Sequence, residues 1–152
     1  MRISRHQMFM EMARVAARRS TCPRLNVGAM LITPDLQVFM GYNGALPGES
    51  HCTDVGCLME RGSCKRTRHA EVNAIKRAGK KLVIGSTLYV TNSPCGDCVD
   101  AIIECGMIQT VYFENEYRSI DPLHLFASHG ITALRLVPNG CIMNLAGERI
   151  ET

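Results

Sequence analysis

Helical and strand patterns alternate along this chain, and the alternation constrains the fold more than any other feature of the sequence. Apolar spacing and end signals predict helices at residues 4–19, 69–78, 95–105 and 121–129. Short β-branched or apolar runs predict strands at residues 27–33, 36–42, 87–92, 108–113 and 132–137. We therefore predict an α/β fold of three layers, in which helices flank a central five-stranded mixed sheet. Functional groups are expected on the loops and helix starts beyond the strand ends.

Two segments fall outside this alternation. Residues 43–68 are polar and rich in glycine and cysteine, without sustained periodicity. So long an irregular segment inside a compact domain requires a function or a staple, and a metal ion is one such staple. Residues 139–152 read either as a further edge strand or as an interface arm. No linker interrupts the pattern, so residues 1–152 are expected to form a single domain.

Composition narrows the class of protein. Hydrophobic residues make up 46% and charged residues 20% of the chain, as in ordinary globular proteins. No apolar run is long enough for a membrane span, and residues 1–20 lack a signal-peptide core, so a cytoplasmic protein without membrane contact is expected. A reducing compartment makes the eight cysteines better candidates for metal than for disulfides. The net charge of +3 suits an anionic small substrate and does not indicate a polynucleotide ligand.

The segment RTRHAEVNAI places His69 two residues before Glu71 at the start of a predicted helix. Taken alone, this pair is most simply an acidic residue placed favourably near a helix N-terminus. The segment SPCGDC places Cys95 and Cys98 at the start of another helix, where thiolates are stabilised. Taken alone, this second pair suits a redox centre or a structural zinc equally well.

Together the two segments predict a catalytic zinc site. His69, Cys95 and Cys98 are ligands of the kinds that zinc prefers, and three protein ligands leave a fourth position for water. Zinc lowers the pKa of that water towards neutrality, and Glu71 is placed to carry protons without binding the metal. The combination H-x-E and P-C-x-x-C is the signature of zinc deaminases. The alternative is a closed, purely structural zinc.

Four segments, NVGAMLI, GYNG, HAEVNAI and SPCGDC, stand in the order and spacing found in the cytidine/deoxycytidylate deaminase superfamily. Over residues 5–137 the chain resembles the deoxycytidylate (dCMP) deaminases, particularly in GYNG and the cysteine-rich insertion. The resemblance implies a cytidine-deaminase-like fold and hydrolysis of dCMP to dUMP, the precursor for thymidylate synthesis. It also implies a homo-oligomer, commonly a hexamer, which dCTP with Mg²⁺ activates and dTTP inhibits.

The resemblance also suggests substrate contacts. Backbone groups near Cys95 and Ala70 would hold the pyrimidine edge, while Glu71 protonates N3 and then the departing amine. The remaining candidates are Asn43 for a sugar hydroxyl, Asn26 for the sugar or phosphate, Tyr117 on the substrate loop, and Arg24 and Arg118 for the 5′-phosphate. For the two asparagines, the alternative is a turn residue that satisfies its own backbone. For the arginines near the first helix, the alternative is a solvated helix surface without a ligand.

Two further sites follow from the resemblance. Similar dCMP deaminases carry a second, structural zinc, and its candidate ligands here are Cys22, Cys52, Cys57 and Cys64. Free buried cysteines are the alternative. Effector binding is assigned to the GYNG segment, which consists of Gly41, Tyr42, Asn43 and Gly44. The alternative is that these glycines only permit a tight turn.

Two rival functions remain open at this point. A tRNA adenosine deaminase shares the zinc motif, but it should carry a more basic surface for RNA contacts than a net charge of +3 suggests. A zinc-stapled interaction module without activity would make no use of Glu71.

Overall fold

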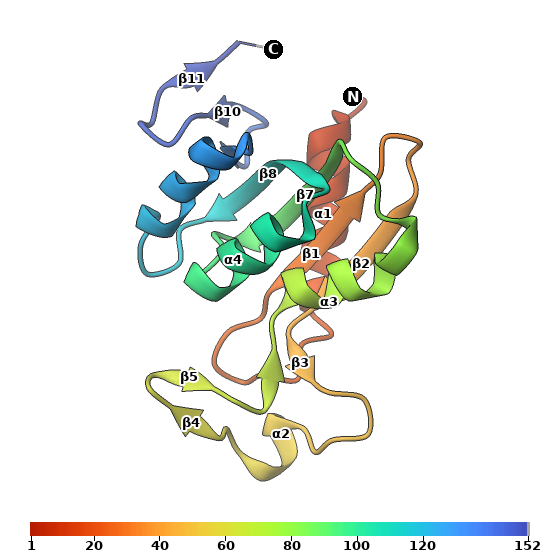
Figure 1. Cartoon of the computed structure of the whole chain (residues 1–152), viewed down its shortest axis with the longest axis vertical. Helices are drawn as coiled ribbons and strands as arrows, with labels where there is room; N and C mark the ends of the chain where they lie inside the picture. The colour runs from red at the N-terminus through yellow and green to blue at the C-terminus, as the bar shows by residue number, and fades with distance from the viewer. Residues whose placement is uncertain (152) are drawn as a thin grey trace.

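A computed structural model describes residues 1–151 and shows a sheet between two layers of helices (Figure 1). Helix α1 (Arg5–Ala17) covers one face. The other face carries α3 (Ala70–Ala78), α4 (Gly96–Cys105) and the 3₁₀ helix η2 (Asp121–His129). The predicted three-layer α/β fold is confirmed.

The sheet has seven strands in the order β11-β10-β9-β8-β7-β1-β2. The five predicted strands are β1 (Gly28–Ile32), β2 (Val38–Tyr42), β7 (Ser86–Asn92), β8 (Ile108–Asn115) and β9 (Thr132–Leu136). Pairs β7–β8 and β8–β9 are parallel, and the other pairs are antiparallel, so the sheet is mixed.

The predicted count of five strands was wrong. Residues 139–151 add β10 (Ile142–Met143) and β11 (Arg149–Ile150), so the C-terminal segment supplies edge strands. Two residues are too short for a period-two pattern to be visible in a sequence. These strands exist because β9 offers them a pairing edge, which is a tertiary effect.

Helix α1 packs closely on the sheet. Ser4 caps it, and Ser4 and Gln7 form a reciprocal capping box, which satisfies backbone donors that the helix leaves free. At Gly28 a β-carbon would lie 1.8 Å from the carbonyl oxygen of Ala13, so only glycine allows this approach. The helix buries Phe9 and Met10 against β1, β7 and β9.

The larger core lies on the opposite face, beneath α3, α4 and η2. Small residues bring α3 close to the sheet: Ala70 and Ala74 are fully buried. A β-carbon at Gly41 of β2 would lie 2.1 Å from the Ala70 carbonyl oxygen. This contact fixes the start of α3, which is where His69 lies.

Helix η2 spans the residues predicted from the sequence, Asp121–His129. Ile120 is the residue before the helix, and both Asp121 and Pro122 lie in the first turn. Pro122 is tolerated there because backbone N–H groups of the first turn need no intrahelical acceptor. Gly130 ends the helix with a left-handed φ of 71°, as predicted.

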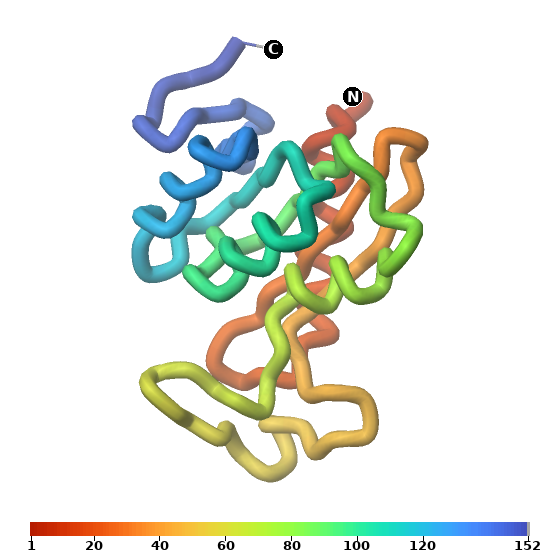
Figure 2. The backbone as a smooth tube through the Cα atoms, in the orientation of Figure 1, coloured from red at the N-terminus to blue at the C-terminus, as the bar shows by residue number. Residues whose placement is uncertain are grey.

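The cysteine-rich segment, residues 43–68, lies beyond one end of the sheet, opposite to both termini (Figure 2). Its elements are β3 (Gly44–Ala45), α2 (Cys52–Val55), β4 (Met59–Glu60), β5 (Ser63–Cys64) and β6 (Thr67–Arg68). Strand β6 pairs with β3 and leads directly into His69. Among residues 1–151, no helix combines the length and apolar character that crossing a membrane requires.

Candidate active site

The two predicted zinc motifs meet at the N-termini of α3 and α4. His69 and Cys95 are the residues that precede these helices, and neither side chain caps its helix by a hydrogen bond. Both side chains are therefore free to turn towards each other. Cys98 lies one turn into α4 and is buried. The site thus stands on rigid elements, beyond the carboxyl end of β7.

The donor atoms of His69, Cys95 and Cys98 lie within 4.8 Å of one another. The Nδ1 atom of His69 is 3.1 Å from the Sγ atom of Cys98 and 3.4 Å from that of Cys95. Nitrogen and sulfur ligands on one tetrahedral zinc stand about 3.5 Å apart, from their usual bond lengths. The group therefore fits zinc both in its chemistry and in its spacing.

Glu71 lies beside this group and is 4% exposed. The thiol of Cys98 donates to its Oε2 atom at 3.4 Å. Burial raises the pKa of the Glu71 carboxyl above its ordinary value, because a charged carboxylate loses solvation there. A raised pKa brings a carboxyl closer to the range in which it both accepts and returns protons.

The pKa values of the two cysteines move in opposite directions. A hydrogen bond from Cys98, and another from His69, lower the pKa of Cys95 to about 4. The same bond with Cys95, together with burial, raises the pKa of Cys98. The pKa of His69 is raised, because its ring forms a hydrogen bond with Cys95. The surroundings thus favour a thiolate at Cys95, the form in which cysteine binds metal.

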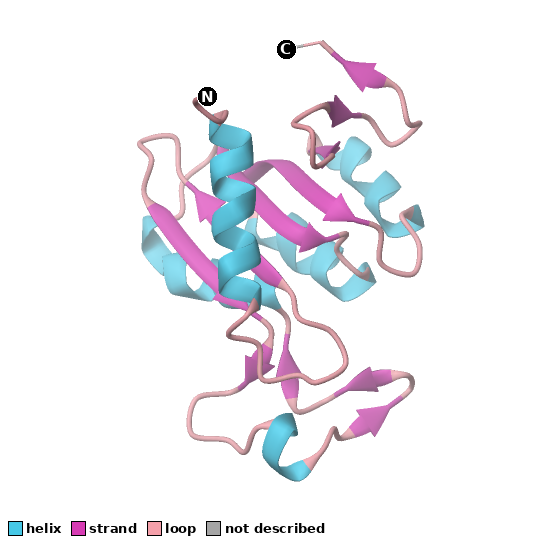
Figure 3. Cartoon of the chain, turned by 180° about the vertical axis from the view of Figure 1, so that it is seen from behind, coloured by secondary structure: helices cyan, strands magenta, loops and turns pink. Residues whose placement is uncertain are grey.

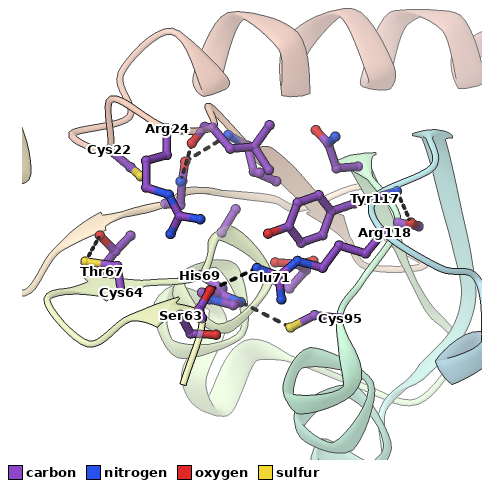
Figure 4. Close-up of a pocket in the computed structure, with 17 residues that line it drawn as sticks. Cys22, Arg24, Ser63, Cys64, Thr67, His69, Glu71, Cys95, Tyr117 and Arg118 are labelled. Atoms are coloured by element: carbon purple, nitrogen blue, oxygen red, sulfur yellow. Dashed lines mark hydrogen bonds between the residues drawn. The ribbon is translucent and has the colours of Figure 1, made fainter. Parts of the chain in front are cut away.

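A cavity of about 220 Å³ opens above the group (Figure 4). Among the residues proposed from the sequence, those that line it are Cys22, Arg24, Asn43, Cys64, His69, Ala70, Glu71, Cys95, Tyr117 and Arg118. One wall comes from the cysteine-rich segment and another from the loop after β8. The cavity therefore joins the predicted zinc centre to the predicted nucleotide contacts.

Two arginines, Arg118 and Arg24, line this cavity. Arg118 has a left-handed φ of 57°, and its guanidinium lies 5.0 Å from the centre of the Tyr117 ring. It also donates to the carbonyl oxygen of Gly62 at 3.0 Å, which ties the β8 loop to the cysteine-rich segment. Arg24 is exposed on the opposite side, near Met59. Both guanidinium groups are accessible to an anion.

The two predicted asparagines differ in position. Asn43 is buried, accepts from the backbone N–H of Val27 at 2.8 Å and donates to the carbonyl of Leu25 at 2.6 Å. Its amide therefore holds the chain that enters β1. Asn26 is exposed and does not line the cavity. Leu25 and Val27 on either side do line it, and neighbouring residues of an extended chain point to opposite sides.

The remaining GYNG residues do not form one surface. Gly41 is buried against α3, and Gly44 pairs with Arg68. Tyr42 is partly exposed, with the guanidinium of Arg77 5.6 Å from its ring centre. Backbone packing thus explains Gly41, whereas Tyr42 remains accessible.

Thr67 and Ser93 also line the cavity, although they were not among the residues predicted from the sequence. Ser93 is buried, and its hydroxyl accepts from the backbone N–H of Tyr117 at 2.7 Å, so it positions the loop after β8. Thr67 donates to the Sγ atom of Cys64 at 3.6 Å. Each stands two residues before a predicted zinc ligand, and this proximity was an available signal.

A second cluster brings together Cys52, Cys57 and Cys64. Their sulfur atoms lie within 4.8 Å of one another, and those of Cys52 and Cys64 are 3.5 Å apart, near the 3.8 Å or so of two thiolates on one zinc. Burial raises the pKa of Cys64, but hydrogen bonds from Thr67 and the backbone outweigh it and lower the pKa to about 6. Cys22, the fourth predicted ligand, is buried but does not belong to the cluster.

Comparison with known proteins identifies the family. Residues 3–115 match the cytidine and deoxycytidylate deaminase zinc-binding region. The chain belongs to this deaminase family. The ComE operon protein 2 of Bacillus subtilis is 42% identical over 147 residues, which cover 95% of this chain and 77% of that protein. The deoxycytidylate deaminase of Schizosaccharomyces pombe is 31% identical over 139 residues, 86% of this chain and 43% of that protein.

A solved deaminase structure shows the same fold. The dCMP deaminase of cyanophage S-TIM5, crystallised with dCMP and dUMP, matches with a TM-score of 0.75 and 31% identity, over 89% of this chain and 98% of that one. The family predicted from the sequence is confirmed, and the chain is an enzyme of this zinc-binding deaminase family. Membership sets aside the alternative of a zinc-stapled module without activity.

Proposed function

We propose that this deaminase hydrolyses dCMP to dUMP and ammonia, within a single domain formed by residues 1–152. The observation that carries the proposal is one cavity that joins the His69, Cys95 and Cys98 group, the buried Glu71 and two accessible arginines. Three metal ligands beside a buried carboxyl suit the removal of an amine from a ring. Arg24 and Arg118 suit a phosphate. Relatives named deoxycytidylate deaminase support this substrate.

His69, Cys95 and Cys98 would hold the zinc. When bound, zinc supplies Lewis-acid activation of the water that attacks C4 of the cytosine ring. Its ligands come from the starts of two packed helices, so the position of the reacting centre is fixed before the substrate binds.

Glu71 carries the protons of the reaction. It accepts one proton from the attacking water and delivers it to N3 of the ring. It then takes the second proton from the hydroxyl now on C4 and passes it to the exocyclic amine, so that the C4–N bond breaks, the C4 carbonyl forms and ammonia leaves. Its burial excludes bulk water from these transfers. Backbone groups near Ala70 and Cys95 line the same cavity and suit the pyrimidine edge.

The sugar and phosphate would lie further out in the cavity. Asn43 already bonds Leu25 and Val27, but its amide keeps one free N–H and one free lone pair for a sugar hydroxyl. Tyr117 lines the cavity on the loop that Ser93 positions. Arg118, on the loop after β8, and Arg24, on the segment before β1, both line the cavity and would meet the 5′-phosphate. Asn26, the other candidate for the sugar or phosphate, does not line the cavity.

The second cluster would hold a structural zinc. Cys52, Cys57 and Cys64 supply three ligands, and Cys22 is the candidate for the fourth because it lines the same cavity as Cys64. Such a site would close the irregular segment that forms one wall of the active site. Its role would be to order this wall and not to take part in the reaction.

We also propose that the enzyme is oligomeric and regulated by nucleotides. We expect a cytoplasmic homo-oligomer, of hexameric size, that dCTP with Mg²⁺ activates and dTTP inhibits. Within GYNG, Tyr42 and the neighbouring Arg77 offer an accessible aromatic ring and a cation to a triphosphate. An effector shifts activity only by its preference for one state, and a preference of about 1–3 kcal/mol changes apparent substrate affinity roughly 5- to 150-fold.

The test is to incubate zinc-loaded protein separately with dCMP, dCTP, deoxycytidine and a tRNA substrate, and to measure ammonia release. Turnover of dCMP well above that of deoxycytidine is expected, because only the nucleotide carries the phosphate. Adenosine deamination in tRNA without turnover of dCMP would refute the proposal. Saturation curves for dCMP with and without each triphosphate test the regulation separately.

A further inference from the structure

Strand β2 ends the sheet with an apolar edge. Within residues 1–151, no strand pairs on its outer side. Val38 and Met40 are 41% and 42% exposed, although both point to the same face as the buried residues Ile32 and Met30, with which they are paired. Exposed apolar side chains thus lie beside the backbone N–H and C=O groups of an edge strand.

The backbone groups that face outward can be assigned from the register. Asn43 donates to the carbonyl of Val27, which makes this a hydrogen-bonded pair between the segments of β2 and β1. In an antiparallel ladder such pairs alternate, so Phe39 and Gly41 also bond inward. Val38 and Met40 therefore direct their N–H and C=O groups away from the sheet, where another strand can pair.

Helix α1 extends this apolar edge. Arg14 on one flank of the helix pairs with Glu114 of β8. Met12 lies about 200° around the helix from Arg14, on the flank that faces β2. Figure 3 shows α1 lying across this face of the sheet. Met8 and Val15 stand next to Met12 on the helix surface, four and three residues away, and are turned further from the sheet.

We call the resulting set the β2 surface. It consists of Met8, Met12, Val15, Val38 and Met40, which are 36% to 65% exposed. Exposed apolar residues that gather beside an open strand edge indicate an interaction site, whereas scattered ones do not.

The other end of the sheet provides a contrast. Strand β11 has two residues, and charged side chains surround it, namely Glu148, Arg149 and Glu151. Short length and charge are the usual protection of an edge against pairing. The sequence of β2, VFMGY, contains no charged residue and no proline. One edge is protected and the other is open.

We propose that the β2 surface is an interface between two copies of this chain, related by a twofold axis and paired antiparallel through β2. A twofold axis brings each surface against itself, so an edge that offers both N–H and C=O groups beside apolar side chains is complementary to its own copy. The interface would be one contact of the homo-oligomer proposed above, and it does not depend on the reaction.

The structure favours one register for this pairing. With Phe39 on the axis, Val38 of one copy faces Met40 of the other, and the outward groups of these residues form four hydrogen bonds. A shift that centres Met40 would require the carbonyl of Tyr42, which already accepts from Asn73 at 2.8 Å. The two α1 helices would then lie about 14 Å apart, three strand spacings, with methionine side chains between them.

The test compares the mass of zinc-loaded variants in solution by sedimentation velocity. Met40→Lys places a charge against its copy and should weaken this contact roughly 100-fold or more, which halves the mass of an even-numbered oligomer at micromolar concentration. Val15→Lys, at a 65% exposed helical position where a fold defect is not expected, should shift the mass in the same direction.

Leu125→Lys on η2 is the matched control, because Leu125 is 46% exposed and lies on the opposite face of the sheet. This variant should keep the mass of the parent. Hydrogen exchange gives a second measurement: the amides of Val38 and Met40 should be protected in the parent and should exchange faster in Met40→Lys. A monomeric parent, or an unchanged mass in both Met40→Lys and Val15→Lys, would overturn the proposal.

Discussion

The two cysteine clusters use similar ligands but stand on very different supports. His69, Cys95 and Cys98 lie at the starts of two regular helices that pack on the sheet. In the segment beyond the end of the sheet, Cys52 lies on a four-residue helix, Cys57 on the loop after it and Cys64 on a short hairpin strand. The protein itself fixes the first cluster, whereas the second is proposed to hold together, through its metal, a segment that has little core of its own.

From this difference we expect different tasks for the two clusters. A reacting centre needs its groups held before the substrate arrives, and buried helices provide that rigidity. A staple instead supplies the order that its surroundings lack. A change at the first cluster should therefore affect the reaction, and a change at the second should affect the wall of the cavity.

The largest expected effect is on turnover. Glu71→Gln should lower kcat by roughly 10²- to 10⁴-fold, because general acid–base catalysis contributes a factor of this size. Zinc should remain bound in this variant. Kinetics with dCMP and metal analysis on the same sample provide the measurement. Glu104→Gln, at an exposed residue of α4, is the control and should behave as the parent. Near-parental turnover in Glu71→Gln would exclude Glu71 as the proton carrier.

The second effect concerns metal content. We expect two zinc ions per chain, and Cys57→Ser should lose the one in the irregular segment while retaining most of kcat. Faster hydrogen exchange in residues 46–66 and a higher KM should accompany the loss. Cys141→Ser, outside both clusters, is the control. A parent with one zinc, whose Cys52, Cys57 and Cys64 react readily with an alkylating agent, would contradict the assignment.

A third change tests whether packing supports the first cluster. Gly41→Ala places a methyl group against the Ala70 carbonyl and should destabilise the fold by about 1–3 kcal/mol. Because α3 must move, zinc should also bind more weakly at His69, Cys95 and Cys98. Urea unfolding and competition with a chelator measure the two effects. If stability is unchanged, the close packing of α3 on β2 is not needed.

The smallest effect lies at the link between the two regions. Arg118→Ala removes the bond to Gly62 and a proposed phosphate contact, so KM for dCMP should rise roughly 10-fold while kcat changes little. Arg2→Ala, at an exposed residue before α1, is the control. Equal effects on dCMP and deoxycytidine would show that Arg118 orders the wall and does not bind phosphate.

Motifs and regular elements were predictable from the sequence. The helices and the five longer strands have strong local patterns, and capping or glycine signals mark their ends. His69 and Glu71 were found because their spacing is fixed along one chain segment, as is that of Cys95 and Cys98. Chemistry then linked the two segments, since the four residues together match a known reaction.

Tertiary structure decided the rest, because distances across the chain are set by packing. The sequence shows four candidate ligands for the second cluster, but folding gathers Cys52, Cys57 and Cys64 and leaves Cys22 apart. GYNG suggests one effector segment, whereas the approach of α3 places Gly41 in the core and only Tyr42 at the surface. The short strands β10 and β11 form because a neighbouring edge receives them, and no local pattern encodes an edge supplied from elsewhere in the chain.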